Sequence, residues 1–80
     1  MNKFLKFTQL LVNQDGKAEE VGLIYIRPEK IFLTREIWDK HDVIISNATL
    51  ICEMGSTAGL VVKGNIEEIM AQIEEDNIYE

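Results

Sequence analysis

The chain has 80 residues, of which 46% are apolar and 28% are charged, and this is the composition of one soluble globular domain. Eight basic and 14 acidic residues give a net charge of −6, which argues against binding to nucleic acid or anionic membranes by charge alone. The single cysteine and single histidine exclude an internal disulfide, a multi-cysteine zinc site and a histidine-rich metal centre.

The N-terminal part of the chain predicts a β-hairpin. Residues 4–12 mix aromatic, apolar and polar side chains in partial alternation, which indicates a strand. One face of this strand is expected to carry Leu5, Phe7 and Leu11. Residues 13–17 form a turn cluster, and Asp15-Gly16 is its strongest signal because glycine accepts positive φ.

Residues 20–26 predict a second strand with two distinct faces. One face carries Val21, Leu23 and Tyr25, and the other carries Ile24 and Ile26. Pro28 ends this strand because it fixes φ and has no N–H to donate, so residues 27–30 form a tight turn with proline second. A third strand is expected over residues 31–37.

The next segment predicts a loop followed by a second hairpin. Residues 38–42 are polar around one tryptophan and indicate a loop, while residues 43–45 are able to extend a strand on either side of it. We expect a strand over residues 48–54, a turn at Gly55, and a partner strand over residues 56–63.

A helix is expected over residues 65–75. Asn65 is a good N-cap, and Glu68 three residues later completes an arrangement like a capping box. The apolar residues of the helix fall at i, i+3, i+4 and i+7 and form one stripe: Ile66, Ile69, Met70 and Ile73. The predicted fold is therefore α+β and mostly β: about five short antiparallel strands in a curled sheet or small barrel, with this amphipathic helix at the end of the chain.

The net charge belongs to the last part of the chain. Residues 1–64 contain eight bases and eight acids, whereas residues 65–80 contain six acids and no base. Acids late in a helix are unfavourable to its dipole, so we expect fraying after Ile73. The acidic tail, residues 76–80, is interpreted as a solvated segment, with docking on a basic partner as the alternative.

Size and surface predict a partner chain. Folding a chain of this mass removes roughly 63% of its surface from water. The apolar part of that area contributes on the order of 125 kcal/mol, against roughly 120 kcal/mol for ordering the chain. Because the two terms nearly cancel, we expect a homo-oligomer in which apolar residues are shared between copies.

We also expect a cytoplasmic protein without a membrane-spanning segment. No apolar run approaches the roughly 18–20 residues that span a bilayer. Lys6 and Gln9 interrupt the apolar segment near the start, unlike the core of a signal peptide.

Four segments together resemble the small FlbD-like proteins, a family named for a flagellar accessory protein and found also in bacteria and phages outside flagellar operons. They are Phe-Thr-Gln-Leu at 7–10, Ile-Tyr-Ile-Arg-Pro-Glu-Lys-Ile at 24–31, Thr-Leu-Ile-Cys-Glu-Met-Gly at 49–55 and Leu-Val-Val-Lys-Gly-Asn-Ile-Glu-Glu-Ile at 60–69. The resemblance covers nearly the whole chain and implies a small β-rich protein with no catalytic residues. A flagellar accessory role is one alternative that it leaves open.

Six residues are candidates for binding a small ligand: Arg27, Lys30, Arg35, Trp38, Ser56 and Thr57. In a symmetric oligomer the bases could converge on an anion, and ordinary surface pairing is the alternative. The Gly-Ser-Thr-Ala-Gly segment at 55–59 could cradle a phosphate through its N–H groups, although it lacks the lysine and helix of a P-loop and a hairpin tip explains it as well.

Aromatic and reactive side chains give weaker signals. Trp38, with Tyr25 and His41, could stack on a nucleobase or fill a partner's pocket, and a small apolar cluster of Trp38 with residues 43 and 44 is the alternative. Cys52 alternates with Leu50 and Met54 and is expected in the core. No catalytic constellation or metal-ligand spacing is present, so we expect neither an enzyme nor a cofactor.

The leading hypothesis is a small non-enzymatic binding module, homo-oligomeric, that occupies a protein partner or a small ligand. Sequestration of an anionic signalling nucleotide at a subunit interface, as in small phage-encoded proteins, is a second hypothesis. RNA or DNA binding by a small barrel is a third, although no basic stripe with interleaved aromatics supports it.

Overall fold

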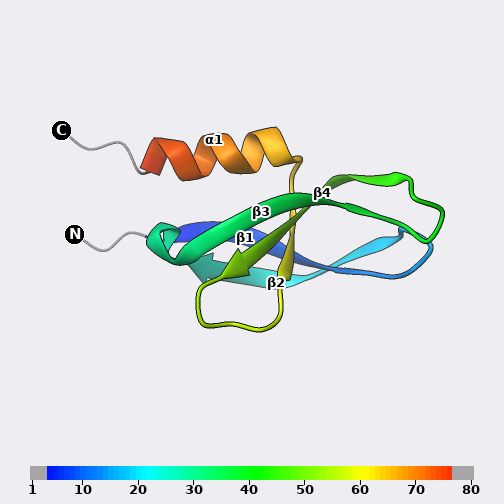
Figure 1. Ribbon diagram of the computed structural model, residues 1–80, viewed down its shortest axis with the longest axis horizontal. Helices are drawn as coiled ribbons and strands as arrows, with labels where there is room; N and C mark the ends of the chain where they lie inside the picture. Colours follow the sequence, from blue (N-terminus) through cyan, green and yellow to red (C-terminus); the bar gives the residue numbers. More distant parts are fainter. Residues whose placement is uncertain (1–3, 77–80) are drawn as a thin grey trace.

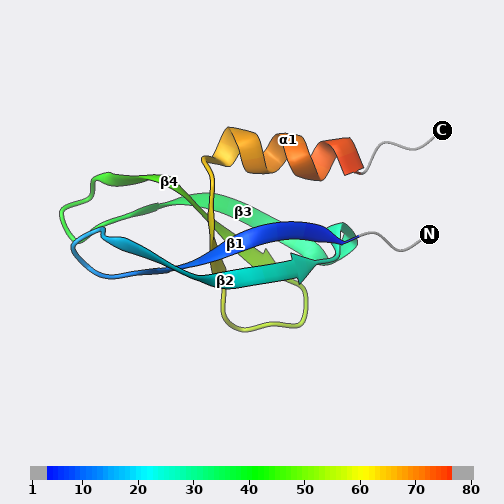
Figure 2. The ribbon, with the colours of Figure 1, turned by 180° about the vertical axis from the view of Figure 1, so that it is seen from behind.

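The computed structural model describes residues 4–76, which form a five-stranded sheet and one helix. The elements in chain order are β1 (Leu5–Val12), β2 (Ala18–Ile26), a 3₁₀ turn (Pro28–Lys30), β3 (Ile31–Trp38), β4 (Ile44–Glu53), β5 (Leu60–Lys63) and α1 (Ile66–Asp76). All neighbouring strands are antiparallel, in the spatial order β2-β1-β5-β4-β3. The sheet curls but does not close, and α1 lies along one side of it (Figures 1 and 2). The predicted fold class is confirmed.

The core lies where the helix meets the sheet. Its buried residues come from four strands and the helix: Leu5, Phe7, Ile26, Ile51, Val62, Ile69 and Ile73. Leu5 lies opposite Ile26 in the β1–β2 ladder, so this pair presents one face of the hairpin to the helix. The helical spacing of Ile69 and Ile73 places both on the sheet side of α1, as the sequence predicts.

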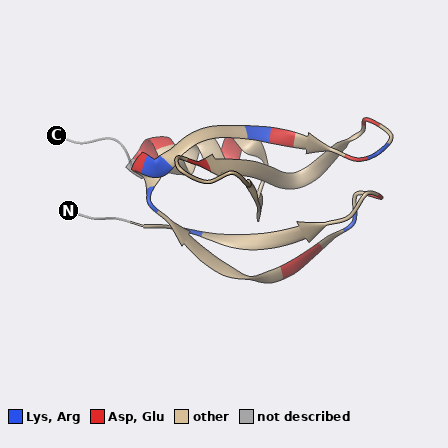
Figure 3. Cartoon of the chain, turned by 60° about the horizontal axis from the view of Figure 1, so that its bottom comes forward, with Lys and Arg blue, Asp and Glu red and all other residues tan. Residues whose placement is uncertain are grey.

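The two long hairpins, β1–β2 and β3–β4, form two layers that meet at their tips (Figure 3). The backbone N–H of Lys40 donates to the carbonyl of Gln14 at 3.1 Å, and the Lys40 ammonium lies 2.9 Å from an Asp15 carboxylate oxygen. The predicted turn at Asp15-Gly16 is present, with Gly16 at φ 82°. The Asn13 side-chain oxygen accepts the N–H groups of Asp15 and Lys17, so this tip is closed by its own residues.

The helix begins at the predicted capping box. The Glu68 N–H donates to Asn65 Oδ1 at 2.8 Å, and the Asn65 N–H donates to Glu68 Oε1 at 3.1 Å. The helix runs from Ile66 to Asp76, close to the predicted range of residues 65–75, and it includes the residues after Ile73 where fraying is expected. Burial of Ile73 against the sheet anchors the last turns. The rest of the predicted acidic tail, residues 77–80, lies outside the described residues.

The residues that share one face of β1 are not all buried. Leu11 is 62% exposed, and Leu10 is buried in its place. The pairing of β1 with β2 shifts between Gln9 and Leu10, because β2 carries one extra residue there, Val21. This extra residue changes the alternation of β2, whereas β1 keeps its own: Leu11 stays on the face of Leu5 and Phe7, but the core cluster does not extend to it.

Two boundaries of the second hairpin also differ from the prediction. Trp38 belongs to β3 rather than to a loop, and β4 begins at Ile44 and runs through Asn47, which has a φ of 60°. Residues 56–59 belong to a loop, residues 54–59, and only Leu60–Lys63 form a strand. Because Ile51 pairs with Leu60, the intervening chain is too long for a two-residue turn.

Candidate functional site

The six predicted ligand-binding residues fall in three places on the described chain. Arg27 and Lys30 flank the 3₁₀ turn, Arg35 and Trp38 lie on β3, and Ser56 and Thr57 lie in the loop after β4. At the rise of an extended strand, Arg35 is roughly 16 Å and Trp38 roughly 26 Å along the chain from Lys30. The loop, in contrast, starts beside Lys30, whose carbonyl accepts the Met54 N–H at 2.8 Å. Only part of the predicted set is therefore gathered within one chain.

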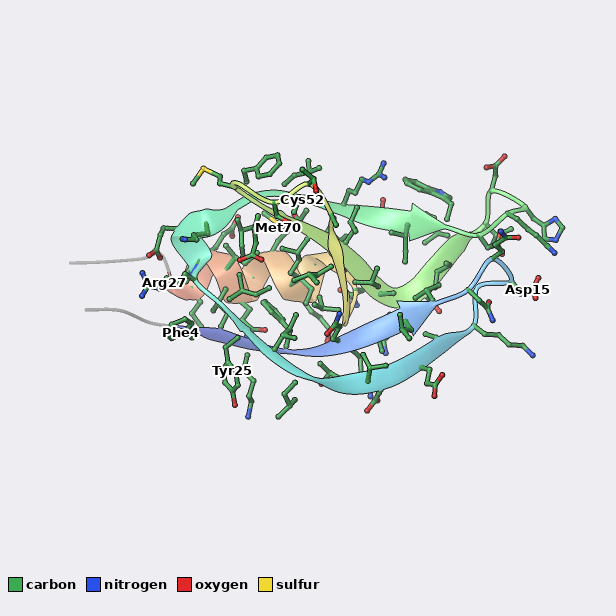
Figure 4. The ribbon with its side chains drawn as sticks, turned by 90° about the horizontal axis from the view of Figure 1, so that it is seen from below. Phe4, Asp15, Tyr25, Arg27, Cys52 and Met70 are labelled. Carbon is green, nitrogen blue, oxygen red and sulfur yellow. The ribbon has the colours of Figure 1, made fainter. Side chains whose placement is uncertain are left out.

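Arg27 is engaged by an aromatic side chain. Its guanidinium carbon lies 5.4 Å from the centre of the Phe4 ring, and the two side chains lie together at one end of the molecule (Figure 4). This distance is that of a cation–π contact. The charge of Arg27 is thereby fixed at the end of β2, half-buried, rather than free in solvent.

The loop with the Gly-Ser-Thr-Ala-Gly segment is closed on itself. The Ser56 hydroxyl donates to the Ala58 carbonyl at 2.9 Å, and the Ala58 N–H points back to the same hydroxyl at 3.3 Å. A Cβ at Gly59 would lie 2.6 Å from a Leu50 methyl carbon, so the loop returns tightly over β4. These contacts favour a structural turn over a phosphate cradle, because the Ala58 N–H is already used.

Cys52 and His41 lie far apart. Cys52 is half-buried beside Gly59 and lies outside the core cluster, so the expectation that it is a core residue is wrong, and Met54 beside it is exposed. Its neighbours explain this position, because Cys52 faces the loop rather than the helix. His41 lies in the tip beyond the Trp38–Ile44 pair, whereas Cys52 pairs with Leu33, roughly 16 Å back along β3 from that pair. This separation does not allow a cysteine–histidine nucleophile.

The tip between β3 and β4 is organised by Asp39. Its Oδ1 accepts the N–H of His41 at 2.8 Å and of Val43 at 3.0 Å. These backbone hydrogen bonds, first that from Val43 and then that from His41, hold the pKa of the Asp39 carboxyl below its usual range. The carboxylate therefore acts as the acceptor that shapes the turn, and Trp38 faces Ile44 across its base.

Large apolar side chains are exposed on the surface of the described residues. On β2, Val21, Leu23 and Tyr25 are 48%, 58% and 61% exposed, and we call these three residues the β2 stripe. They form the face that the sequence predicts as one side of the strand. Tyr25 points away from the helix and the body of the molecule (Figure 4).

A second apolar surface lies at the opposite edge of the sheet. Phe32 and Leu33 on β3 and Met70 on α1 line a small hollow of about 130 Å³, which we call the β3 groove. The Thr34 hydroxyl donates to the Met70 sulfur at 2.9 Å and ties the helix to this edge. Sequence reasoning did not single out Phe32 and Leu33, although three consecutive apolar residues at 31–33 indicate a strand that is apolar on both faces.

No family model, curated protein or solved structure matches the chain. The resemblance to FlbD-like proteins therefore stays a prediction. Within residues 4–76, no helix is long and apolar enough to cross a membrane, and no group of three or more potential metal ligands is present.

Proposed function

We propose that this chain is a non-enzymatic binding module that works as a homo-oligomer and holds a protein partner through apolar contacts. One observation carries the proposal: twelve large apolar side chains are exposed in the described residues, whereas nine apolar residues are buried. A stable monomer rarely leaves extended apolar patches in water, because burying them against another surface is favourable.

The placement of these side chains supports two separate contacts. The β2 stripe and the β3 groove lie on the first and last strands of the sheet order, so one chain is able to use both at the same time. Strands at the edge of a sheet also offer unpaired backbone groups to another chain. A module with two such edges is suited to joining its own copies while holding a partner.

The hollows of the surface favour a protein partner over an anionic nucleotide. Three hollows, of about 550, 510 and 130 Å³, are lined by one base in all, Lys17. A phosphate group needs several converging donors, for which arginine is the most suitable side chain. Arg27 and Arg35 line none of these hollows.

Light scattering coupled to size-exclusion chromatography tests the proposal. At low micromolar concentration we expect a mass of at least twice the 9.2 kDa of one chain. A clean monomer would overturn it. A thermal-shift screen with nucleotides serves as the second arm, since a ligand at about 100 times its Kd adds about 2.7 kcal/mol to stability. A shift with a nucleotide would favour sequestration instead.

A further inference from the structure

We infer that Met70 is a site of oxidative modification, and that conversion of its thioether to a sulfoxide by a peroxide loosens α1 from the β3 edge of the sheet. The loosening follows from the packing of the helix alone. Its consequence for a bound partner rests on the proposed function, because Met70 is part of the β3 groove.

Met70 lies where the helix meets the edge strand. Its side chain lines the β3 groove together with Phe32 and Leu33, and Figure 4 shows it beside the helix. Met70 is 36% exposed, so a small oxidant in water reaches it without unfolding of the chain. Three residues further along, Ile73 is buried and belongs to the core cluster. This part of α1 therefore carries an accessible sulfur next to a residue that holds the helix on the sheet.

The sulfur of Met70 has a defined partner on the strand. The Thr34 hydroxyl donates to Met70 Sδ at 2.9 Å and joins the helix to a residue 36 positions earlier in the sequence. Thioether sulfur is a weak acceptor, so the hydrogen bond by itself contributes little energy. Its importance is geometric, because it fixes the distance between the helix side chain and β3.

That distance leaves no space for an added oxygen atom. In a sulfoxide the acceptor is the new oxygen, one bond beyond the sulfur, and its hydrogen bond to the Thr34 hydroxyl alone needs about 2.7 Å. Because the sulfur itself now lies 2.9 Å from that hydroxyl, keeping the hydrogen bond requires the sulfur to move away from β3. If the sulfur stays, the Thr34 contact is lost and a polar oxygen is placed at an apolar groove. Both arrangements weaken the attachment of α1.

The reaction requires one co-reactant, a peroxide such as hydrogen peroxide. A lone pair of Sδ attacks one peroxide oxygen, and an S–O bond forms as the O–O bond breaks. The proton of the transferred oxygen passes to the leaving oxygen, which departs as water. The thioether is oxidised by two electrons and the peroxide is reduced by two. Methionine sulfoxide reductases return the thioether, so the change is reversible.

Met54 provides a matched comparison within the chain. It is 58% exposed and lies in the loop after β4, outside the helix and the core cluster. Its backbone N–H donates to the Lys30 carbonyl, and oxidation of the side chain leaves that hydrogen bond intact. We therefore expect peroxide to oxidise both methionines and to change the structure only through Met70.

The test compares Met54→Leu, which keeps Met70, with Met70→Leu, which keeps Met54. Leucine preserves the apolar volume, so both variants should fold. Each is melted before and after treatment with hydrogen peroxide, and peptide mass spectrometry locates the added oxygen. We expect the melting midpoint of oxidised Met54→Leu to fall by at least about 4 °C and that of oxidised Met70→Leu to stay within about 1 °C. Both variants contain Cys52, so any oxidation of the thiol affects them equally.

Hydrogen exchange locates the change in the fold. In oxidised Met54→Leu the amides of residues 70–75 should exchange at least about threefold faster, whereas those of residues 48–52 in β4 should be unaffected. Treatment with methionine sulfoxide reductases should restore both the exchange rates and the melting midpoint.

The outcomes separate this inference from the proposed function. Equal midpoints for oxidised and unoxidised Met54→Leu would overturn the inference. An equal fall in both variants would overturn it as well, because the effect would then not belong to Met70. Neither result touches self-association of the unoxidised chain. Conversely, a monomeric unoxidised chain would refute the proposed function and leave the expected loosening of α1 unchanged.

Discussion

At the scale of single residues, Asp39 shows how one exposed carboxylate shapes a turn. It accepts two backbone N–H groups that the tip between β3 and β4 would otherwise leave to water. Asp42 in the same tip has a φ of 63°, a conformation that aspartate tolerates better than most residues. The polar sequence predicts a loop here but does not identify which acid closes it, because Asp39 and Asp42 flank Lys40 and His41 within four residues.

Replacing Asp39 by alanine should lower stability in a pH-dependent way. The folded-state pKa of Asp39 is lowered, so the stabilisation is present above its ordinary pKa of 3.8 and is lost as pH falls through the folded-state value. Thermal melts of the unmodified chain and of Asp39→Ala should differ at neutral pH and converge below 3.8. Asp39→Asn keeps an acceptor oxygen and should show a smaller difference at neutral pH. A gap between the unmodified chain and Asp39→Ala that stays constant into the acid range would contradict this account.

At the scale of elements, the turns and caps that depend on local chemistry could be predicted from the sequence. The features that depend on pairing with neighbouring strands could not. Asp15-Gly16, Pro28 and Asn65 act on their own backbone, and all three mark the boundaries that the structure has. The bulge at Val21 depends on the register with β1, and the course of β4 through Asn47 depends on β5, since the Asn47 carbonyl accepts the Gly64 N–H at 3.0 Å. The side chains that share each face of β2 could be predicted from alternation. That β2 lies at an edge of the sheet follows only from the order of the strands.

The helix start gives the clearest prediction at this scale. Asn65→Ala removes the acceptor for the Glu68 N–H and should cost about 1 kcal/mol of unfolding free energy. Denaturant unfolding measures the change. Asn65→Asp retains the acceptor and serves as the control, with a loss well below that of alanine. Equal losses for the two variants would show that the cap does not stabilise the helix.

At the scale of the whole molecule, the balance between covered and uncovered apolar surface governs behaviour. The core cluster contains only seven buried residues, and both edges of the sheet are open. A chain of this kind gains stability when copies associate, because association removes apolar surface from water without further ordering of the backbone.

The melting temperature should therefore rise with protein concentration. For an associating chain, mass action favours the folded oligomer, so a hundredfold increase in concentration should raise the midpoint measurably. Differential scanning calorimetry over such a range provides the measurement. Leu23→Glu is the comparison, and its midpoint should depend less on concentration. A midpoint of the unmodified chain that does not move would argue against association in the folded state.

The acidic helix beside β3 also has a consequence for growth into fibres. A sheet with two free edges is able to add strands from other chains at both edges, and one edge must be blocked if this addition is to stop. Exposed Glu67, Glu74 and Glu75 place negative charge on the helix along that side, and this charge opposes the approach of a second acidic helix. High salt screens this repulsion, so concentrated salt is the condition under which the protein is least protected from precipitation.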